Sequence, residues 1–226
     1  MHNQGYAYGA WGLVMTMVLV SLFFIFRFIP MRTRLGKRSG GALIAFIVAL
    51  FTEMYGFPLT IYLLTHWFGL RIQLDHISGH LLGDLITSLE LGNGWAIVML
   101  VSNGLLLLGI WIVMKGWEQV YASQGQLVTD GLYAHMRHPQ YTGIFVITLA
   151  FMIQWPTITT LVLWPFVIAM YYRLARREEQ DALQKFGDAY RRYMKRTPMF
   201  IPRLSGPPGD RDTGKNVAEN GGRSGA

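Results

Sequence analysis

The stretch Leu127–Gly143 reads LVTDGLYAHMRHPQYTG and lies between two long apolar regions of the chain. A connector between two membrane helices needs only a turn and a few polar residues, whereas this one is crowded with hydrogen-bonding and titratable groups. These groups are Asp130, Tyr133, His135, Arg137, His138, Gln140 and Tyr141. A second polar cluster, Arg176–Glu179, comes at the end of the next apolar region. We predict that the two clusters meet at the membrane surface and form one active site.

The composition of the 226-residue chain favours a membrane protein. Charged residues make up 15% of it, against about a quarter in a typical soluble domain, and its mean hydropathy is +0.29. The chain has no cysteine, which excludes disulfide scaffolds and cysteine-based metal or nucleophile chemistry. A net charge of +7 would suggest nucleic acid for a soluble protein. Because the apolar runs are so long, we assign the basic excess to anionic lipid headgroups and expect a bilayer, not nucleic acid, as partner.

The apolar segments predict an all-α, polytopic transmembrane helix bundle with about five spans. They cover residues 11–29, 41–65, 95–114, 140–153 and 157–175. The third is expected to extend past the bilayer before a turn at Ser123–Gln126. The last two are expected to form a helical hairpin that turns near Gln154–Thr157, where Pro156 interrupts the apolar run.

The charges of the loops predict the orientation. The first loop, Met31–Gly40, holds four basic residues and no acidic one, which is typical of a cytoplasmic loop. The N-terminus is then outside and the C-terminus is cytoplasmic. The segment Arg176–Lys195 is expected to be helical with a bend near Phe186-Gly187. We predict one membrane-embedded domain over residues 1–203, with a cofactor-binding core at 118–203, and a disordered tail at 204–226.

Two features of the first half of the chain each have a structural and a functional interpretation. Glu53 lies inside an apolar run, where a charge is costly, so it either contacts a substrate or is paired with a neighbouring polar group. In the loop His66–Gly94, the residues His76, His80 and Asp84 are spaced four apart, as metal ligands on one helix face can be. No recognised metal-binding pattern surrounds them, so an amphipathic helix on the outer interface is the favoured interpretation, and we predict no metal site.

The two cytoplasmic clusters offer complementary chemistry. Arg137 and His138 can hold an anion, Tyr133 and Tyr141 offer hydroxyls and aromatic faces, and the Glu178-Glu179 pair can bind an amine or ribose hydroxyls. Such a set suits a cofactor that carries both charges and a heteroaromatic ring. The alternative is that the basic residues bind lipid headgroups and that the glutamates balance neighbouring arginines. The chain has no Gly-rich dinucleotide or P-loop pattern and no Ser-His-Asp or Cys-His arrangement.

An ordered series of motifs changes the balance between these interpretations. It comprises Gly131-x-Tyr133-x-x-x-Arg137-His138-Pro139-x-Tyr141-x-Gly143, then Glu178-Glu179, then Phe186-Gly187-x-x-Tyr190, then Pro198 and Ile201-Pro202. This series resembles the integral-membrane methyltransferases, namely the isoprenylcysteine carboxyl methyltransferases and the related phospholipid N-methyltransferases. The resemblance covers about residues 118–203, and the first half of the chain is similar only in having apolar spans.

The resemblance implies that S-adenosylmethionine binds between the polar turn and the cytoplasmic end of the last span. The implied cofactor-binding residues are Gln126, Leu127, Val128, Tyr133, His138, Pro139, Gln140, Tyr141, Glu178 and Glu179, with Glu118 as a looser match. The implied catalytic residues are Arg137, His138 and Glu178. The carboxyl methyltransferases have a substrate-binding arginine at the register of Leu174, so Arg173, Arg176 and Glu53 are the substrate contacts we predict.

The predicted reaction is methyl transfer to a lipophilic or small apolar acceptor at the cytoplasmic face of a membrane, expected to be the plasma (inner) membrane. A carboxylate acceptor needs no base, whereas an amine or thiol must lose a proton to Glu178, His138 or water. Three alternatives stay open: a phospholipid N-methyltransferase, an NADPH-dependent sterol-type reductase, which shares the Arg-His-Pro-x-Tyr turn, and a non-enzymatic transport subunit. The sequence identifies neither the acceptor nor the oligomeric state.

Overall fold

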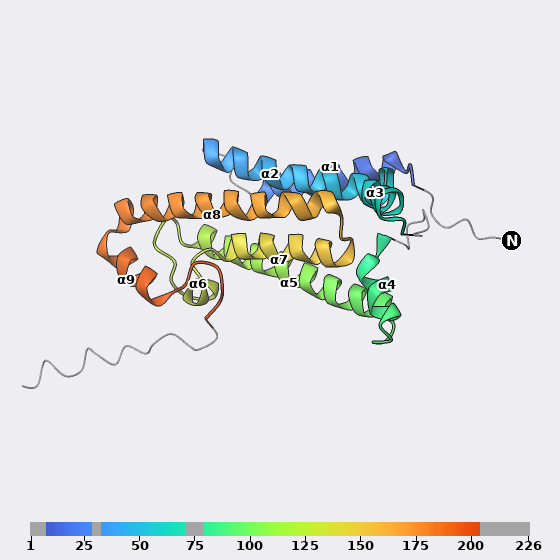
Figure 1. Ribbon diagram of the computed structural model, residues 1–226. Coiled ribbons are helices and arrows are strands. Elements are labelled where there is room, and N and C mark those ends of the chain that lie inside the picture. The colour runs from blue at the N-terminus through green and yellow to red at the C-terminus, as the bar shows by residue number, and fades with distance from the viewer. Residues whose placement is uncertain (1–7, 29–32, 71–78, 204–226) are drawn as a thin grey trace, which may run out of the picture.

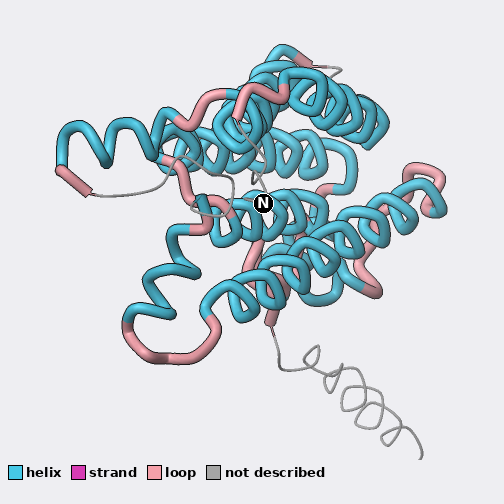
Figure 2. The backbone as a smooth tube through the Cα atoms, turned by 90° about the vertical axis from the view of Figure 1, so that its right-hand side faces the viewer, coloured by secondary structure: helices cyan, strands magenta, loops and turns pink. Residues whose placement is uncertain are grey.

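The computed structural model of the chain describes residues 8–28, 33–70 and 79–203. These residues form helices joined by loops and contain no strand (Figure 2), which confirms the predicted all-α class. In chain order the helices are α1 (Trp11–Phe28), α2 (Arg34–Phe51), η1 (Thr52–Gly56), α3 (Leu59–Phe68), α4 (Leu81–Ser88), α5 (Gly94–Ala122), α6 (Leu132–His135), α7 (Pro139–Gln154), α8 (Ile158–Phe186) and α9 (Asp188–Arg196).

Five helices run along the bundle in alternating directions: α1, α2, α5, α7 and α8 (Figure 1). Helix α7 packs along α5, and α2 packs along α8. The bundle therefore has two ends, which we call the α9 end and the α3 end after the short helices that lie there. Helices α1, α5 and α8 finish at the α9 end, and α2 and α7 begin there (Figure 1).

The surface of the bundle suits a bilayer. Large apolar side chains such as Phe23, Leu107 and Phe166 are exposed on α1, α5 and α8, as expected where lipid replaces water. Within the described residues, four helical stretches are long and apolar enough to cross a membrane. Helix α7 has only 16 residues, about 24 Å of helix, which is shorter than a hydrocarbon core of about 30 Å. The fifth span and the orientation of the bundle stay predictions.

Glycine allows α5 and α7 to approach closely. A β-carbon on Gly143 would lie 2.8 Å from the carbonyl oxygen of Gly109 and 2.6 Å from a methyl group of Val113. Small residues at a helix contact let backbones pack together in membranes, where the hydrophobic effect gives helices little reason to associate. This contact holds the start of α7 against the final turns of α5, which is where the candidate site lies.

The main core fills the space between α2, α7 and α8. Its most buried side chains are Phe46, Leu50, Val167 and Tyr171. The hydroxyl of Ser39 also donates across this contact to the carbonyl oxygen of Met170, at 3.2 Å. The first turns of α2 thus lie beside the last third of α8, at the α9 end.

The predicted basic loop and second span need correction. Helix α2 begins at Arg34, because the side chain of Thr33 caps it by accepting a hydrogen bond from the Gly36 backbone amide at 2.9 Å. Much of the expected loop 31–40 is therefore the first turns of a helix, and residues 29–32 lie outside the described range.

The expected span 41–65 is not one continuous helix. Helix α2 passes into the π-helical turn η1, and Phe57 then adopts extended backbone before Pro58. The residue before a proline avoids the helical region, and proline has no amide hydrogen to continue the ladder, so the helix stops here. A new helix, α3, begins at Leu59.

The predicted hairpin of α7 and α8 is confirmed, with its turn at Trp155–Thr157. Helix α8 contains Pro165 and runs without a break from the expected last span into the helix predicted from residue 176, as far as Phe186. The bend predicted near Phe186-Gly187 is confirmed: Gly187 has a φ of 54° and separates α8 from α9. This left-handed conformation suits glycine, which has no β-carbon to clash.

The expected outer loop 66–94 contains more helix than predicted. Helix α3 extends to Phe68, and α4 covers only Leu81–Ser88 of the expected interfacial helix. Residues 71–78, which include His76, and the predicted disordered tail 204–226 lie outside the described residues.

Candidate active site

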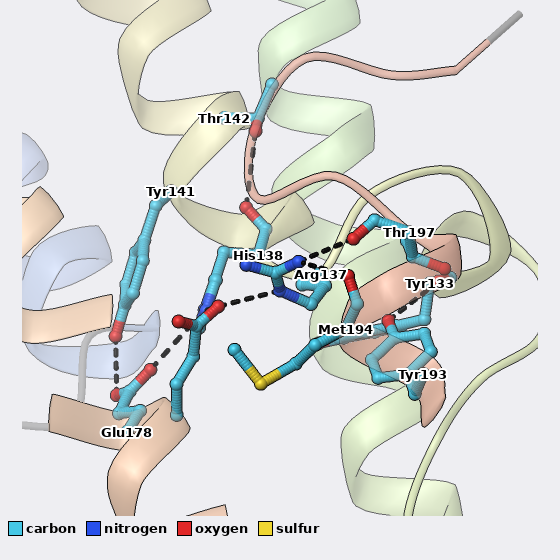
Figure 3. A network of polar contacts seen from close by, with 10 residues as sticks. Tyr133, Arg137, His138, Tyr141, Thr142, Glu178, Tyr193, Met194 and Thr197 are labelled. Atoms are coloured by element: carbon cyan, nitrogen blue, oxygen red, sulfur yellow. Dashed lines mark hydrogen bonds and ion pairs between the residues drawn. The ribbon is translucent and has the colours of Figure 1, made fainter. Parts of the chain in front are cut away.

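The predicted meeting of the two polar clusters takes place at the α9 end (Figure 3). The loop before α7 brings Arg137 and His138 against Glu178 and Glu179, which lie in the final third of α8. Helix α9 covers this arrangement from one side. The site is thus assembled from three segments that are distant in sequence.

The loop before α7 is anchored to α5. Gly131 has a φ of 56°, and a β-carbon there would lie 1.8 Å from the side-chain amide of Gln119. That same side chain accepts a hydrogen bond from the Leu132 backbone amide at 3.2 Å and donates to the Asp130 carbonyl at 3.4 Å. Glycine is needed here both for the conformation and for the close approach.

A C-terminal strap, residues 198–203, runs back over the same loop. The backbone amides of Arg137 and His138 donate to the carbonyl groups of Pro198 and Met199, at 2.9 and 3.0 Å. These two backbone hydrogen bonds therefore fix the two motif residues from outside, although Arg137 and His138 lie about sixty positions earlier in the chain.

Arg137 forms a buried clamp. Its Nε donates to Glu179 Oε1 at 2.7 Å, and its Nη1 donates to the carbonyl groups of Met194 and Thr197 at 3.1 and 2.5 Å (Figure 3). The side chains of Arg137 and Glu179 are only 10% and 3% exposed. Two buried charges are tolerable only when each neutralises the other, so the predicted anion-holding charge of Arg137 is already engaged by Glu179.

His138 lies between the two glutamates. Its Nδ1 is 3.7 Å from Glu178 Oε2, and its Nε2 is 3.5 Å from Glu179 Oε1. The imidazole stacks on the ring of Tyr141, with centroids 5.6 Å apart. The Nε2 atom is buried and has no hydrogen-bond partner among the described residues.

Glu178 differs from its neighbour in exposure. Its side chain is 41% exposed, against 3% for Glu179. The Tyr141 hydroxyl donates to Glu178 Oε1 at 2.6 Å and so fixes the carboxylate at the edge of an open space (Figure 3). Of the two adjacent glutamates, one holds the structure together and the other faces a cavity.

Buried tyrosines close the floor of the site. The Tyr193 hydroxyl donates to the Tyr133 carbonyl at 2.7 Å, and the Gln140 side-chain amide donates to the Tyr133 hydroxyl. Burial raises the pKa of Tyr190 to about 12, and burial also raises the pKa of Tyr133 and of Tyr193 above the usual value for tyrosine. These hydroxyls are therefore neutral at any ordinary pH and act as hydrogen-bond donors.

A cavity of about 460 Å³ opens beside these groups. Eight of the ten predicted cofactor-binding residues line it: Gln126, Leu127, Val128, Tyr133, His138, Gln140, Tyr141 and Glu178. The other two, Pro139 and Glu179, are buried behind its wall. Glu118, the looser match, instead pairs with Lys115 in an exposed ion pair at 2.7 Å.

A second cavity, of about 270 Å³, lies between α1, α2, α5 and α7. Its lining is apolar apart from Ser21, Gln140 and the Tyr141 hydroxyl, and none of the described residues that line it carries a charge. Trp117, Gln140 and Tyr141 line both cavities. The two cavities therefore adjoin each other, with these three side chains of α5 and α7 at the boundary.

The predicted substrate contacts are not brought together with this site. Arg173 and Arg176 are exposed on α8 and line neither cavity. Glu53 lies at the α3 end, where its Oε2 accepts a hydrogen bond from the Thr60 amide at 2.8 Å. Thr60 Oγ1 in turn accepts from the amide of Ile158, the first residue of α8. Glu178 is twenty residues further along that helix, or roughly 30 Å away.

His80 also belongs to the α3 end. Its Nδ1 is 2.7 Å from the Gln154 carbonyl oxygen, and its ring lies edge-on to Trp155. No group of three or more His, Asp or Glu side chains suited to a metal ion occurs in the described part of the chain.

Sequence reasoning missed several residues that line the polar cavity. Tyr193 and Phe186 lie in the predicted helix 176–195, but neither was assigned to the site. Trp117 was not assigned to it either. Lys185 was missed because nothing in its local sequence distinguishes it from the other basic residues of α8 and α9.

Comparisons with known proteins agree with the motif series. The model of the isoprenylcysteine carboxyl methyltransferase (ICMT) family matches residues 90–185. The Protein-S-isoprenylcysteine O-methyltransferase of Schizosaccharomyces pombe is 35% identical over 77 residues, which are 34% of this chain and 33% of the relative. The chain therefore matches only a third of that protein's length.

Two bacterial relatives match a larger part of the chain. The cobalt-zinc-cadmium resistance protein CzcN of Cupriavidus metallidurans is 30% identical over 159 residues, which are 62% of this chain and 73% of the relative. The methanethiol S-methyltransferase of Crocosphaera subtropica is 31% identical over 141 residues, which are 60% of this chain and 53% of the relative.

Proposed function

This chain belongs to the isoprenylcysteine carboxyl methyltransferase (ICMT) family, and we propose that it transfers a methyl group from S-adenosylmethionine to a lipophilic acceptor at a membrane surface. One observation carries the proposal. A polar cavity and an apolar cavity share the residues Trp117, Gln140 and Tyr141. A reaction between a charged, water-soluble donor and a lipophilic acceptor needs such a junction.

The polar cavity fits this cofactor by its chemistry. The half-exposed carboxylate of Glu178 is suited to an amino group or to ribose hydroxyls. The aromatic faces of Trp117, Tyr133 and Tyr190 are suited to an adenine ring and to a sulfonium, because aromatic faces attract cations. His138 lines the cavity, and its buried Nε2 makes no closer contact than 3.5 Å to Glu179 Oε1, which supports a polar ligand or water at this wall.

When bound, S-adenosylmethionine would supply a methyl group on a sulfonium, which a lone pair of the acceptor displaces in line. The protein's task is then to position the two reactants and to exclude water. Tyr141 holds Glu178 in place through its hydroxyl. If the acceptor carries a proton, Glu178 or His138 is placed to accept it. Arg137 and Glu179 act as a positioning pair, because the Arg137 guanidinium is engaged by the Glu179 carboxylate and by two backbone carbonyl groups.

The apolar cavity favours an acceptor that is uncharged where it enters. None of the described residues that line this cavity is charged, and an unpaired carboxylate in apolar surroundings is strongly disfavoured. In addition, Leu174 is buried at the register where the carboxyl methyltransferases carry a substrate-binding arginine. A thiol, or an amine that enters in its neutral form, therefore fits the cavity better than a carboxylate.

The α9 end would face the cytoplasm. The basic first turns of α2 lie at the same end as the site, because Ser39 contacts Met170. Basic residues beside membrane helices concentrate on the cytoplasmic side. The inner (plasma) membrane is the location that we propose, with the cofactor cavity open to the cytoplasmic pool of S-adenosylmethionine.

Binding measurements test the cofactor. The protein purified in detergent should bind S-adenosylhomocysteine with micromolar or tighter affinity by calorimetry, and His138→Ala should remove that binding. The same titration with NADPH addresses the sterol-type reductase alternative. Binding of NADPH without binding of S-adenosylhomocysteine would overturn the proposal, and binding of neither would favour a non-enzymatic protein.

A matched pair of substitutions tests the acceptor cavity. Leu106 lines it, whereas the adjacent Leu107 is 69% exposed on the outside of α5. Leu106→Trp should fill the cavity and raise the KM for the acceptor in a labelled-methyl assay with a lipid extract, while S-adenosylhomocysteine binding stays unchanged. Leu107→Trp should change neither quantity. Equal acceptor KM values in the two variants would exclude this cavity as the acceptor site.

A further inference from the structure

Lys185 stands at the mouth of the polar cavity, in the last turn of α8. Its ammonium donates to the carbonyl oxygen of Gly125 at 2.7 Å and lies 4.9 Å from the centroid of the Phe186 ring. A lysine in the last turn of a helix often interacts only with the carbonyl groups of that helix. This one reaches across the cavity mouth to the turn that follows α5.

Among the described residues that line the polar cavity, two are lysine or arginine, namely Lys185 and Arg137. Arg137 is engaged by the Glu179 carboxylate and by two backbone carbonyl groups. An ammonium can donate three hydrogen bonds, and the contact of Lys185 with Gly125 uses one of them. Lys185 is therefore the cation that can still receive an anionic group of a ligand.

We propose that Lys185 binds the carboxylate at the amino-acid end of S-adenosylmethionine. This inference rests on the proposed function, because it assumes that this cofactor occupies the polar cavity. The carboxylate is the one anionic group of the cofactor, and a charge-assisted hydrogen bond to an ammonium is the strongest contact that the cavity mouth offers it.

The assignment also orients the cofactor. Lys185 and Gly125 mark the outer end of the cavity, and Gln140 and Tyr141 mark the inner end, where the apolar cavity begins. With the carboxylate at Lys185, the sulfonium lies further in and its methyl group can face the apolar cavity. Glu178, on the same helix as Lys185 and seven residues before it, is then beside the amino group.

Two ligands that differ in the amino-acid end test the proposal. S-adenosylhomocysteine has the carboxylate, whereas 5′-methylthioadenosine keeps the adenosine and the thioether without it. Calorimetry should give about tenfold weaker binding of S-adenosylhomocysteine to Lys185→Gln than to the unchanged protein. Binding of 5′-methylthioadenosine should be the same for both proteins within a factor of about two.

Lys195→Gln is the matched control, since it removes the same charge from an exposed position on α9 and should change neither affinity. If Lys185→Gln weakened both ligands equally, Lys185 would act through the turn at Gly125 and the proposal would be wrong. An unchanged affinity for S-adenosylhomocysteine would also overturn it. If the unchanged protein bound neither ligand, the proposed function itself would fail, and this inference with it.

Discussion

Glu53 and Glu179 are both almost fully buried, with 4% and 2% of their surfaces exposed, and they lie at opposite ends of the bundle. Glu179 is paired with Arg137 at 2.7 Å and lies behind the wall of a cavity. Glu53 accepts one hydrogen bond from the Thr60 amide, and its Oε1 has no partner among the described residues. Neither cavity reaches it.

The comparison separates a buried glutamate that supports a cavity wall from one that lies far from both cavities. Either glutamate alone would attract attention in a membrane segment, where ionisable residues are costly and often functional. What distinguishes the α9 end is the neighbour, Glu178, whose carboxylate faces an open cavity while Glu179 secures the loop that carries His138. At the α3 end, the carboxylate of Glu53 instead accepts from the first turn of α3.

The largest effect is expected for Arg137→Met, which leaves Glu179 buried and uncompensated. Removal of one partner from a buried ion pair costs about 3–5 kcal/mol in the free energy of unfolding. The midpoint of denaturant unfolding in detergent should fall accordingly, and S-adenosylhomocysteine binding should be lost. The double variant Arg137→Met/Glu179→Leu should recover much of the stability, because it removes both charges. No recovery would mean that the two backbone contacts of Arg137, and not its charge, hold the site.

The next effect is expected for Glu178→Gln, which should weaken S-adenosylhomocysteine binding by about 10- to 100-fold, as expected when a hydrogen bond to a charged group is lost. The free energy of unfolding should change by less than about 1 kcal/mol, because this side chain is partly exposed. Calorimetry and denaturant unfolding measured on the same preparation check both statements. A large loss of stability would place Glu178 with Glu179 as a structural residue.

A smaller effect is expected for Tyr141→Phe, which removes the hydroxyl that donates to Glu178. The ring and its stacking on His138 remain. A neutral hydrogen-bond donor is worth about 1 kcal/mol, so the affinity for S-adenosylhomocysteine should fall about fivefold. If the affinity were unchanged while turnover fell, the hydroxyl would act on the reacting groups and not on the orientation of Glu178.

The smallest effect is expected for Glu53→Gln, the same substitution as at Glu178 but at the opposite end. The amide oxygen can still accept from Thr60, so the free energy of unfolding should change by less than about 1 kcal/mol. Cofactor affinity and turnover should stay within a factor of about two. A turnover loss as large as that of Glu178→Gln would show that the two ends are coupled and would break the comparison.

Much of the fold could be predicted because the decisive signals are local. The hairpin of α7 and α8 follows from an apolar run interrupted at Pro156, and its turn was found there. The errors concern helix ends. The basic residues of 31–40 were taken to form a loop, whereas α2 begins at Arg34 under the cap at Thr33. Charge reports the position of a residue relative to the bilayer and does not stop a helix.

The candidate site also has a part that could be predicted from the sequence and a part that could not. The loop residues from Gln126 to Tyr141 could be predicted because they form one continuous motif, and the structure brings them to one cavity. Lys185 and Trp117 could not, since their place depends on how α5 and α8 pack. The sequence could also have shown that Glu53 is remote from the site. It lies nineteen residues after Arg34, which corresponds to roughly 28 Å of helix from the basic end of α2.

The strap over the motif loop has a consequence for biosynthesis. It is the last of the described segments to be synthesised, and it supplies the carbonyl groups that hold Arg137 and His138. All the described helices leave the ribosome before it does. A nascent chain can therefore insert these helices into the bilayer while the wall of the polar cavity is still incomplete, so that the protein acquires its binding site only after the strap has been synthesised.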